Sequence, residues 1–229
     1  MARMLHQYDS TAMHLRLGRR HVRLCGRIPG AEQFASAIQP KLDSLFAKEQ
    51  ERKAETEKRE NAYDDVVLHD TQLDDAVRTV FERVRQYDRE HKTQTLELLF
   101  PGKVYSDIIN KPLSEEPHAV NKIVVKLEGM DAGPEFREFA DMLKQKTEIS
   151  IDSWNRYQQT VIRCNELTAA EELLKLEVRQ QYEYNWLDAR KAFGVRVANS
   201  IFPKVNRKTL INDNSDNDAD DEQQSTTEQ

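Results

Sequence analysis

The sequence predicts an all-α fold, an elongated antiparallel helical bundle, from three observations. From residue 31 to residue 100 the chain has no glycine and a single proline, Pro40, so this long segment has almost no helix breaker. Charged residues make up 32% of the chain and hydrophobic residues 38%, which is typical of exposed amphipathic helices rather than of a thick globular core. Apolar residues also recur at helical spacing. We therefore expect three long helices, at about 31–92, 134–165 and 168–201.

Residues 1–30 form a basic arm with six arginines and one acid, Asp9. The stretch HLRLGRRHVRLCG, residues 14–26, alternates apolar and basic residues on either side of GRR, and a period of two predicts a short β-hairpin. This alternation argues against a mitochondrial transit peptide, which needs a helical moment. We expect the apolar face of the hairpin to dock on the bundle. The candidate contacts for a nucleic acid or another acidic partner are Arg16, Arg19, Arg20, Arg23 and Arg27.

The charged stretch at 48–61 leaves two arrangements open for the first long helix. It contains five acids and five bases, so it is either the turn of a helical hairpin or a solvated part of one helix. Counting in sevens from Ile38 and Leu45 reaches apolar residues again at Val66 and Leu73, as in a coiled coil. We favour a single helix, because a turn would have no reason to preserve that register.

Residues 93–133 are rich in proline and glycine, which predicts a connector that crosses an end of the bundle. Ser114 could cap a short helix at about 115–128 within this connector, and Gly129 would end that helix.

The second half of the chain predicts two antiparallel helices followed by a tail. Pro134 suits the first turn of one helix, and Thr168 with Glu171 matches a capping box that would start the other. We expect the two helices to be joined near residues 164–168. From residue 209 to the end there are seven acids and no lysine or arginine, so residues 205–229 predict a disordered acidic tail. The expected domains are the arm at 1–30, the bundle at 31–204 and this tail.

Metal-binding patterns are incomplete in this chain. Asp65 and His69 are four residues apart, as are Asp70 and Asp74, and helical side chains at this spacing can share a metal. A di-iron bundle also needs Glu-x-x-His motifs on two helices, whereas residues 134–201 contain no histidine. The tail begins like an EF-hand loop but lacks the required glycine and the final glutamate. We expect no metal ligands.

Catalytic and membrane-spanning patterns are missing as well. Cys25 and Cys164 are far apart, and the chain has no G-x-S-x-G motif, P-loop or Rossmann glycine pattern. We therefore expect no catalytic residues, no cofactor, no small-molecule substrate and no enzymatic activity. No apolar run approaches the roughly 18 residues of a membrane span. A cytoplasmic protein without a membrane partner is the expected setting.

The long amphipathic stripes then predict a non-enzymatic interaction or scaffold protein that binds a protein partner or associates with itself. The alternative is a nucleic-acid-associated protein that uses the arginine-rich arm, with the acidic tail competing for the same surface. Against the alternative stand a pI of about 5.6 and the lack of a recognition helix. Tyr182 and Trp186 should pack in the core and Tyr184 at its edge, because residues four apart share a helix face.

Overall fold

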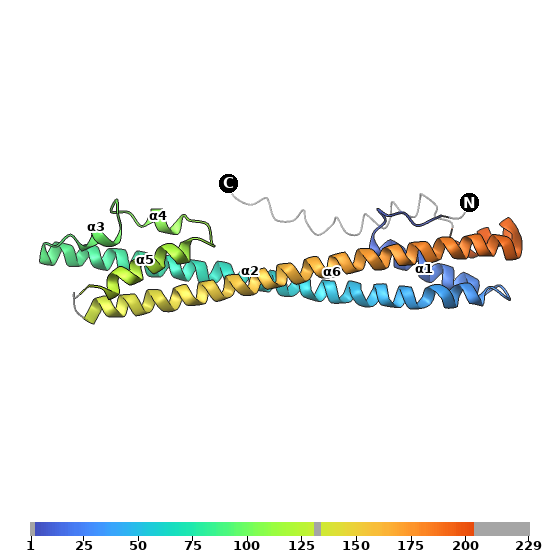
Figure 1. Cartoon of the computed structure of the whole chain (residues 1–229), viewed down its shortest axis with the longest axis horizontal. Coiled ribbons are helices and arrows are strands. Elements are labelled where there is room, and N and C mark those ends of the chain that lie inside the picture. The colour runs from blue at the N-terminus through green and yellow to red at the C-terminus, as the bar shows by residue number, and fades with distance from the viewer. Residues whose placement is uncertain (1–2, 131–133, 204–229) are drawn as a thin grey trace, which may run out of the picture. The chain divides into compact units, whose positions relative to one another are not determined.

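The computed structural model describes residues 3–130 and 134–203, and these residues form helices without any strand (Figure 1). The all-α prediction is therefore confirmed for the described chain. The acidic tail predicted at 205–229 lies outside the described residues. In chain order the helices are α1 (Thr11–Cys25), α2 (Glu32–His91), α3 (Thr95–Leu99), α4 (Ser106–Ile109), α5 (Glu116–Glu128) and α6 (Pro134–Ile201).

The predicted N-terminal β-hairpin is wrong, because residues 11–25 form the helix α1. Ser10 caps this helix, and its hydroxyl accepts a hydrogen bond from the backbone N–H of Met13 at 3.2 Å. The period of two arose from counting His14 and His21 with the basic residues. Both histidines are buried, so they belong to the inner face of a helix, and the arginines of α1 lie on its exposed face.

Gly18, expected in the hairpin turn, lies instead in the middle of α1, where this helix packs on α2. A Cβ atom at this position would overlap the buried side chain of Leu42. The missing side chain is what lets the two helices approach so closely.

Helix α2 runs without interruption from Glu32 to His91, through the charged stretch at 48–61. The hairpin alternative for this segment is therefore excluded. The register of seven is confirmed on both sides of the charged stretch, because Ile38, Leu45, Val66 and Leu73 are all buried.

The break predicted near residues 164–168 is also wrong, since α6 continues from Pro134 to Ile201. No proline or glycine lies between Pro134 and Gly194, so nothing in that segment stops the helix. Glu171, expected in a capping box, instead accepts a hydrogen bond from the Thr11 hydroxyl of α1. The actual interruption is at Gly194, whose φ of 75° and ψ of 168° belong to a region that is essentially restricted to glycine.

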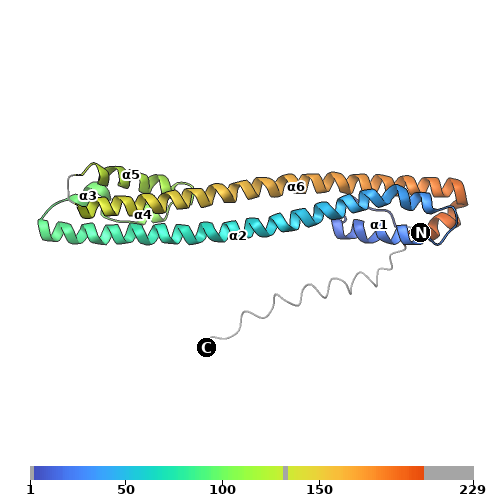
Figure 2. The ribbon, with the colours of Figure 1, turned by 90° about the horizontal axis from the view of Figure 1, so that it is seen from below.

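The chain divides into two compact units, and each has its own hydrophobic core. Unit 1 combines residues 1–51 with residues from 167 onward, so that α1 packs against the first part of α2 and the last part of α6 (Figure 2). In this unit Lys41 of α2 pairs with Glu177 of α6 at 3.5 Å, and Asn185 of α6 reaches Phe34. The rising numbers on α2 meet falling numbers on α6, so the two segments are antiparallel.

Unit 2 comprises residues 52–166, in which α3, α4 and α5 gather beside α2 and α6 (Figure 1). Its α2 and α6 segments are antiparallel too, because Lys146 donates a hydrogen bond to Gln72 at 2.9 Å and the ring of Tyr157 contacts that of Tyr63. The short connector helices complete the core of this unit with Leu99, Ile108, Val120, Ile123 and Leu127.

Candidate polyanion interface

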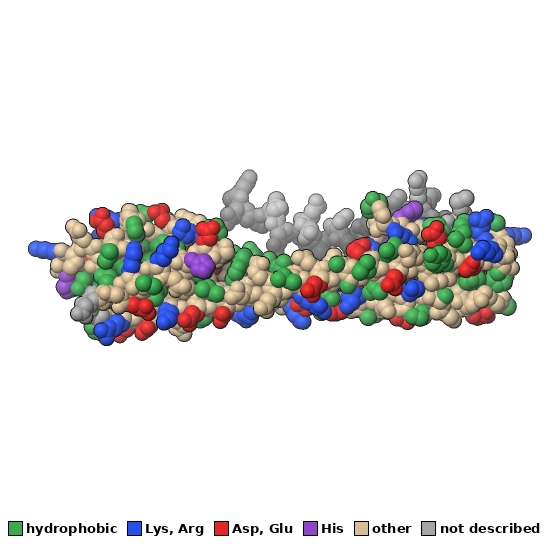
Figure 3. All heavy atoms as spheres, in the orientation of Figure 1, with side chains coloured by type: hydrophobic (Ala, Val, Ile, Leu, Met, Phe, Trp, Pro, Cys, Tyr) green, Lys and Arg blue, Asp and Glu red, His purple; other side chains and the backbone are tan. Residues whose placement is uncertain are grey.

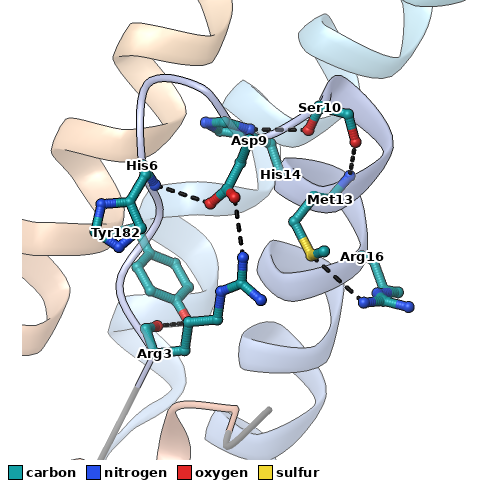
Figure 4. A network of polar contacts seen from close by, with 8 residues as sticks. All are labelled: Arg3, His6, Asp9, Ser10, Met13, His14, Arg16 and Tyr182. Carbon is teal, nitrogen blue, oxygen red and sulfur yellow. Dashed lines mark hydrogen bonds and ion pairs between the residues drawn. The ribbon is translucent and has the colours of Figure 1, made fainter. Parts of the chain in front are cut away.

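The segment before α1 fixes where this helix begins (Figure 4). The Asp9 carboxylate accepts hydrogen bonds from the Arg3 guanidinium and from the backbone N–H of His6, each at 2.9 Å. The backbone of Arg3 is in turn held at its carbonyl by the Tyr182 hydroxyl, 3.3 Å away, and its N–H donates to the Pro203 carbonyl at 3.1 Å. These hydrogen bonds hold the segment before α1 against α6 and against Pro203, which follows α6.

The inner face of α1 is held by a buried polar network around His21. Its Nδ1 lies 2.8 Å from the Ile201 carbonyl, and its Nε2 lies 3.1 Å from the amide nitrogen of Asn185, which also donates to the Phe34 carbonyl at 2.8 Å. All three contacts are satisfied by a neutral imidazole with its proton on Nδ1. Burial lowers the pKa of His21 and outweighs the hydrogen bond to Ile201, which raises it.

Cys25 lies beside this network but has no features of a nucleophile. Its sulfur is 3.6 Å from both ring nitrogens of His21, and its side chain is fully buried. Burial raises the pKa of the Cys25 thiol to about 12, so the thiol stays protonated at neutral pH. Cys25 and His21 therefore pack together as structural groups.

The five arginines named from the sequence all lie on the solvent side of α1 or directly after it, and all five are exposed. The four within the helix are spaced i, i+3, i+4 and i+7, which places them on one face, opposite the buried histidines. No acid occurs between residues 10 and 31. We call this surface the arginine face; it consists of Arg16, Arg19, Arg20, Arg23 and Arg27.

Two of these arginines contact neighbouring side chains. The Arg19 guanidinium lies 4.6 Å from the centre of the Phe46 ring, a cation–π contact, and Arg16 donates to the Met13 sulfur at 3.4 Å. These contacts orient the two side chains while leaving them exposed.

The geometry of the arginine face suits a linear polyanion. From Arg16 to Arg23 the helix rises about 10 Å, at 1.5 Å per residue. A DNA strand carries one phosphate per about 3.4 Å along its axis, so several phosphates match this length. Guanidinium groups bind phosphate, sulfate or carboxylate oxygens in pairs of hydrogen bonds. Such contacts bind charge without reading a sequence.

Unit 2 brings Asp70 and Asp74 of α2 together with Glu116 in the first turn of α5. Glu116 is 1% exposed, and its Oε1 has no hydrogen-bond partner among the described residues. Burial raises the pKa of Glu116 to about 9, helped by hydrogen bonds to the two aspartates and by their negative charge. Glu116 is therefore protonated at neutral pH. In the described part of the chain no group of three or more His, Cys, Asp or Glu side chains could hold a metal ion.

An exposed apolar stripe runs along α6 in unit 1, and the sequence analysis missed it. It consists of Leu173, Leu176, Tyr184 and Leu187, which are 65%, 38%, 58% and 40% exposed. Together with Gln180 these residues follow steps of 3, 4, 4 and 3, so they share one helix face. Figure 3 shows hydrophobic side chains lying among charged ones on one face of the protein.

The opposite face of the same segment is buried. The side chains of Val178, Tyr182 and Ala189 are inaccessible to solvent, which confirms the prediction that Tyr182 packs in the core. Tyr184, which was predicted at the edge of the core, is instead 58% exposed. This segment of α6 is therefore apolar on two opposite sides, of which one is covered by the chain itself. The signal in the sequence was a second set of leucines between the core positions.

Comparison with known proteins adds no relative: no family model matches the chain, and no curated protein or solved structure matches it. None of the helices over residues 3–130 and 134–203 is long and apolar enough to cross a membrane. Over the described residues, the fold is helical, with a basic face on α1 and an exposed apolar stripe on α6.

Proposed function

We propose that this chain is a non-enzymatic interaction protein that docks a helix of a protein partner along the α6 stripe. The observation that carries the proposal is that α6 is apolar on two opposite sides in unit 1, with only one side covered. Exposed apolar side chains aligned on one face typically mark an interaction surface, whereas scattered ones need no explanation. The stripe extends over about 21 Å, at 1.5 Å per residue, which matches four turns of a partner helix.

Burial of the stripe against a partner helix contributes a moderate favourable free energy of binding. Full burial of a leucine-sized side chain contributes about 1.5–3 kcal/mol, so four side chains that are already half-covered contribute about 1 kcal/mol each before the costs of association. This gain suits a helix-in-groove contact in which apolar residues of a partner helix recur every three or four positions.

Charges beside the stripe favour a different protein over a second copy. Glu172 and Glu183 lie on one side of it, and Glu177 and Asp188 lie on the other. Two stripes facing each other would bring these acids together, although lysines of the chain pair with three of them. A partner helix with lysines or arginines beside its apolar face would meet opposite charge.

The proposal is tested with Leu173→Gln combined with Leu187→Gln, and Val125→Gln serves as the matched control. Val125 is 67% exposed and lies on α5 in unit 2, so it is not part of the stripe. Tagged forms of each chain are used to isolate partners, and the purified partner is then titrated against each form. We expect the stripe variant to weaken binding at least tenfold and the control to leave it unchanged.

Two results would contradict this function. Equal affinity of both variants for the reconstituted partner would show that the stripe is not the docking surface. Light scattering that finds a dimer of the wild-type chain, reduced to a monomer by the stripe variant, would replace a foreign partner by self-association.

We propose a second function, binding of a polyanion such as a nucleic acid, on the separate observation of the arginine face. Arg20, Arg23 and Arg27 are exposed guanidiniums in a segment without any acid. Replacing all three by glutamine should weaken binding of a labelled DNA duplex. The slope of log affinity against log salt should fall by up to about 2.7, because each phosphate that an arginine neutralises contributes about 0.9 to it.

A matched control removes the same charge from unit 2 by replacing three exposed arginines of α2 with glutamine. Fluorescence anisotropy between 50 and 200 mM salt compares both variants with the wild-type chain. The second function is refuted if the control variant weakens duplex binding as much as the α1 variant does. It is also refuted if neither the wild-type chain nor a chain without residues 209–229 binds the duplex at 50 mM salt. The control residues are Arg83, Arg85 and Arg89.

A further inference from the structure

We propose that the acidic segment 213–222 of this chain occupies the arginine face of α1 and competes there with external polyanions. This inference deepens the second proposed function, because both use the same arginines. It rests on the charge of the two segments and on the place where the chain leaves the described structure.

The two segments are complementary in charge. Residues 213–222, with the sequence DNSDNDADDE, carry six acids and no base. The stretch from residue 10 to residue 31 carries five arginines and no acid. Carboxylates are among the anions that guanidinium groups bind with two hydrogen bonds, so the chemistry of the segment fits the face.

The chain leaves the described structure beside α1. The Ile201 carbonyl lies 2.8 Å from His21 Nδ1, and the ring of Phe202 stacks on the imidazole with 4.2 Å between the ring centres. The carbonyl of the last described residue, Pro203, accepts a hydrogen bond from Arg3. The acidic segment is therefore attached close to the helix that it is proposed to contact.

The connecting length is sufficient. Nine residues, 204–212, separate Pro203 from Asp213. Ten steps of chain span about 17 Å on average when flexible and about 35 Å at most when extended. Helix α1, with 15 residues, is about 22 Å long. The acidic segment can thus reach every arginine of the face.

Because the acidic segment belongs to the same chain as the arginine face, even weak ion pairs between the two are populated. A short tether gives the attached segment an effective concentration in the millimolar range. An external polyanion must displace the acidic segment, which is present at this effective concentration, from the arginine face. The segment therefore lowers the apparent affinity of the chain for the polyanion but does not abolish binding. The pairs lie at the surface and should be screened by salt.

The first experiment places a nitroxide spin label on Ala219→Cys in the full chain and measures broadening of backbone amide signals by NMR. Both native cysteines are buried, so the label goes to the new thiol. At 50 mM salt we expect broadening of the α1 amides around Arg20 and Arg23. At 500 mM salt the broadening should disappear.

The matched control keeps the length of the segment and removes its charge, with asparagine at its five aspartates and Glu222→Gln. In this neutral variant the α1 amides should stay sharp at low salt as well. Broadening confined to residues 204–208, which include Lys204, Arg207 and Lys208, would overturn the inference, because the acids would then pair with the tether itself.

The second experiment measures duplex binding at 50 mM salt by the wild-type chain and by the neutral variant. We expect the neutral variant to bind about tenfold more tightly, and the gain to vanish when Arg20, Arg23 and Arg27 are replaced by glutamine. Equal affinities together with unbroadened α1 amides overturn the inference while the polyanion function stands. Broadened α1 amides with no duplex binding by any form refute the polyanion function while the contact of the acidic segment stands.

Discussion

Glu116 should make unit 2 lose stability as the pH rises. Burial raises the pKa of this carboxyl from 4.5 to about 9, so between these values the folded chain holds a proton that the unfolded chain releases. The stabilising effect is complete below pH 4.5 and is lost as the pH approaches 9. For one proton the free energy of unfolding falls by at most about 1.4 kcal/mol per pH unit. Burial also raises the pKa of the neighbouring Asp74, so this slope is a ceiling.

The Glu116→Gln variant removes the titration but keeps a group that can donate a hydrogen bond to the aspartates. Between pH 5.5 and 8.5 the wild-type chain should lose up to about 4 kcal/mol relative to this variant, from three pH units at the maximal slope. Urea unfolding followed by circular dichroism gives the free energies, and amide exchange in α5 assigns the effect to unit 2. Glu115→Gln is the control, because Glu115 is the exposed neighbour.

Parallel pH curves for the wild-type chain and Glu116→Gln would refute this reasoning. They would show that Glu116 ionises in its usual range and that the contact of α5 with Asp70 and Asp74 tolerates three negative charges. A difference equally large in Glu115→Gln would show that the effect comes from general charge on α5, without a buried proton.

Three further predictions concern the packing of unit 1. The pKa of His21 is lowered in the folded chain, so the opening free energy of α1, obtained from its amide protection factors, should fall as the pH drops below 6.5, and an opening free energy independent of pH would contradict the neutral imidazole. Gly194→Ala should cost about 1–3 kcal/mol in urea unfolding because of its glycine-only backbone angles, and an unchanged midpoint would show that the kink relaxes. Gly18→Ala should cost about 1–3 kcal/mol by overlap with Leu42, offset by about 1 kcal/mol of helix propensity. A double-mutant cycle with Leu42→Ala checks this origin, and additive effects would rule out the overlap.

The elements predicted correctly are those whose sequence pattern depends on neighbouring residues and repeats over many helical turns. The register of seven from Ile38 to Leu73 survives the charged stretch because no turn interrupts the helix between these residues. The elements predicted wrongly depend on which residues are buried. His14 and His21 looked basic in sequence, and only their contacts with Ser10 and Ile201 show that they belong to the inner face of a helix.

The candidate surfaces divide in the same way. The arginines of α1 could be singled out from the sequence, since five arginines without an acid form a local pattern. Glu116 could not be foreseen, because its partners Asp70 and Asp74 lie more than forty residues away. The α6 stripe was hidden for a different reason: in sequence its leucines look like the core residues Val178 and Tyr182, and only the packing of unit 1 shows which set is covered.

Helix α1 separates the residues that hold unit 1 together from those that carry its charge. Its inner face is bound by the network of His21 and Asn185, whereas the arginine face points to the opposite side. Removing charge from Arg20, Arg23 and Arg27 therefore leaves the buried contacts intact, and a loss of polyanion binding in that variant measures the surface alone. The same separation means that acid, which protonates His21, should loosen α1 without removing its positive charge. Salt and pH thus act on different sides of this helix, since salt screens the arginine face and acid weakens the network beneath it.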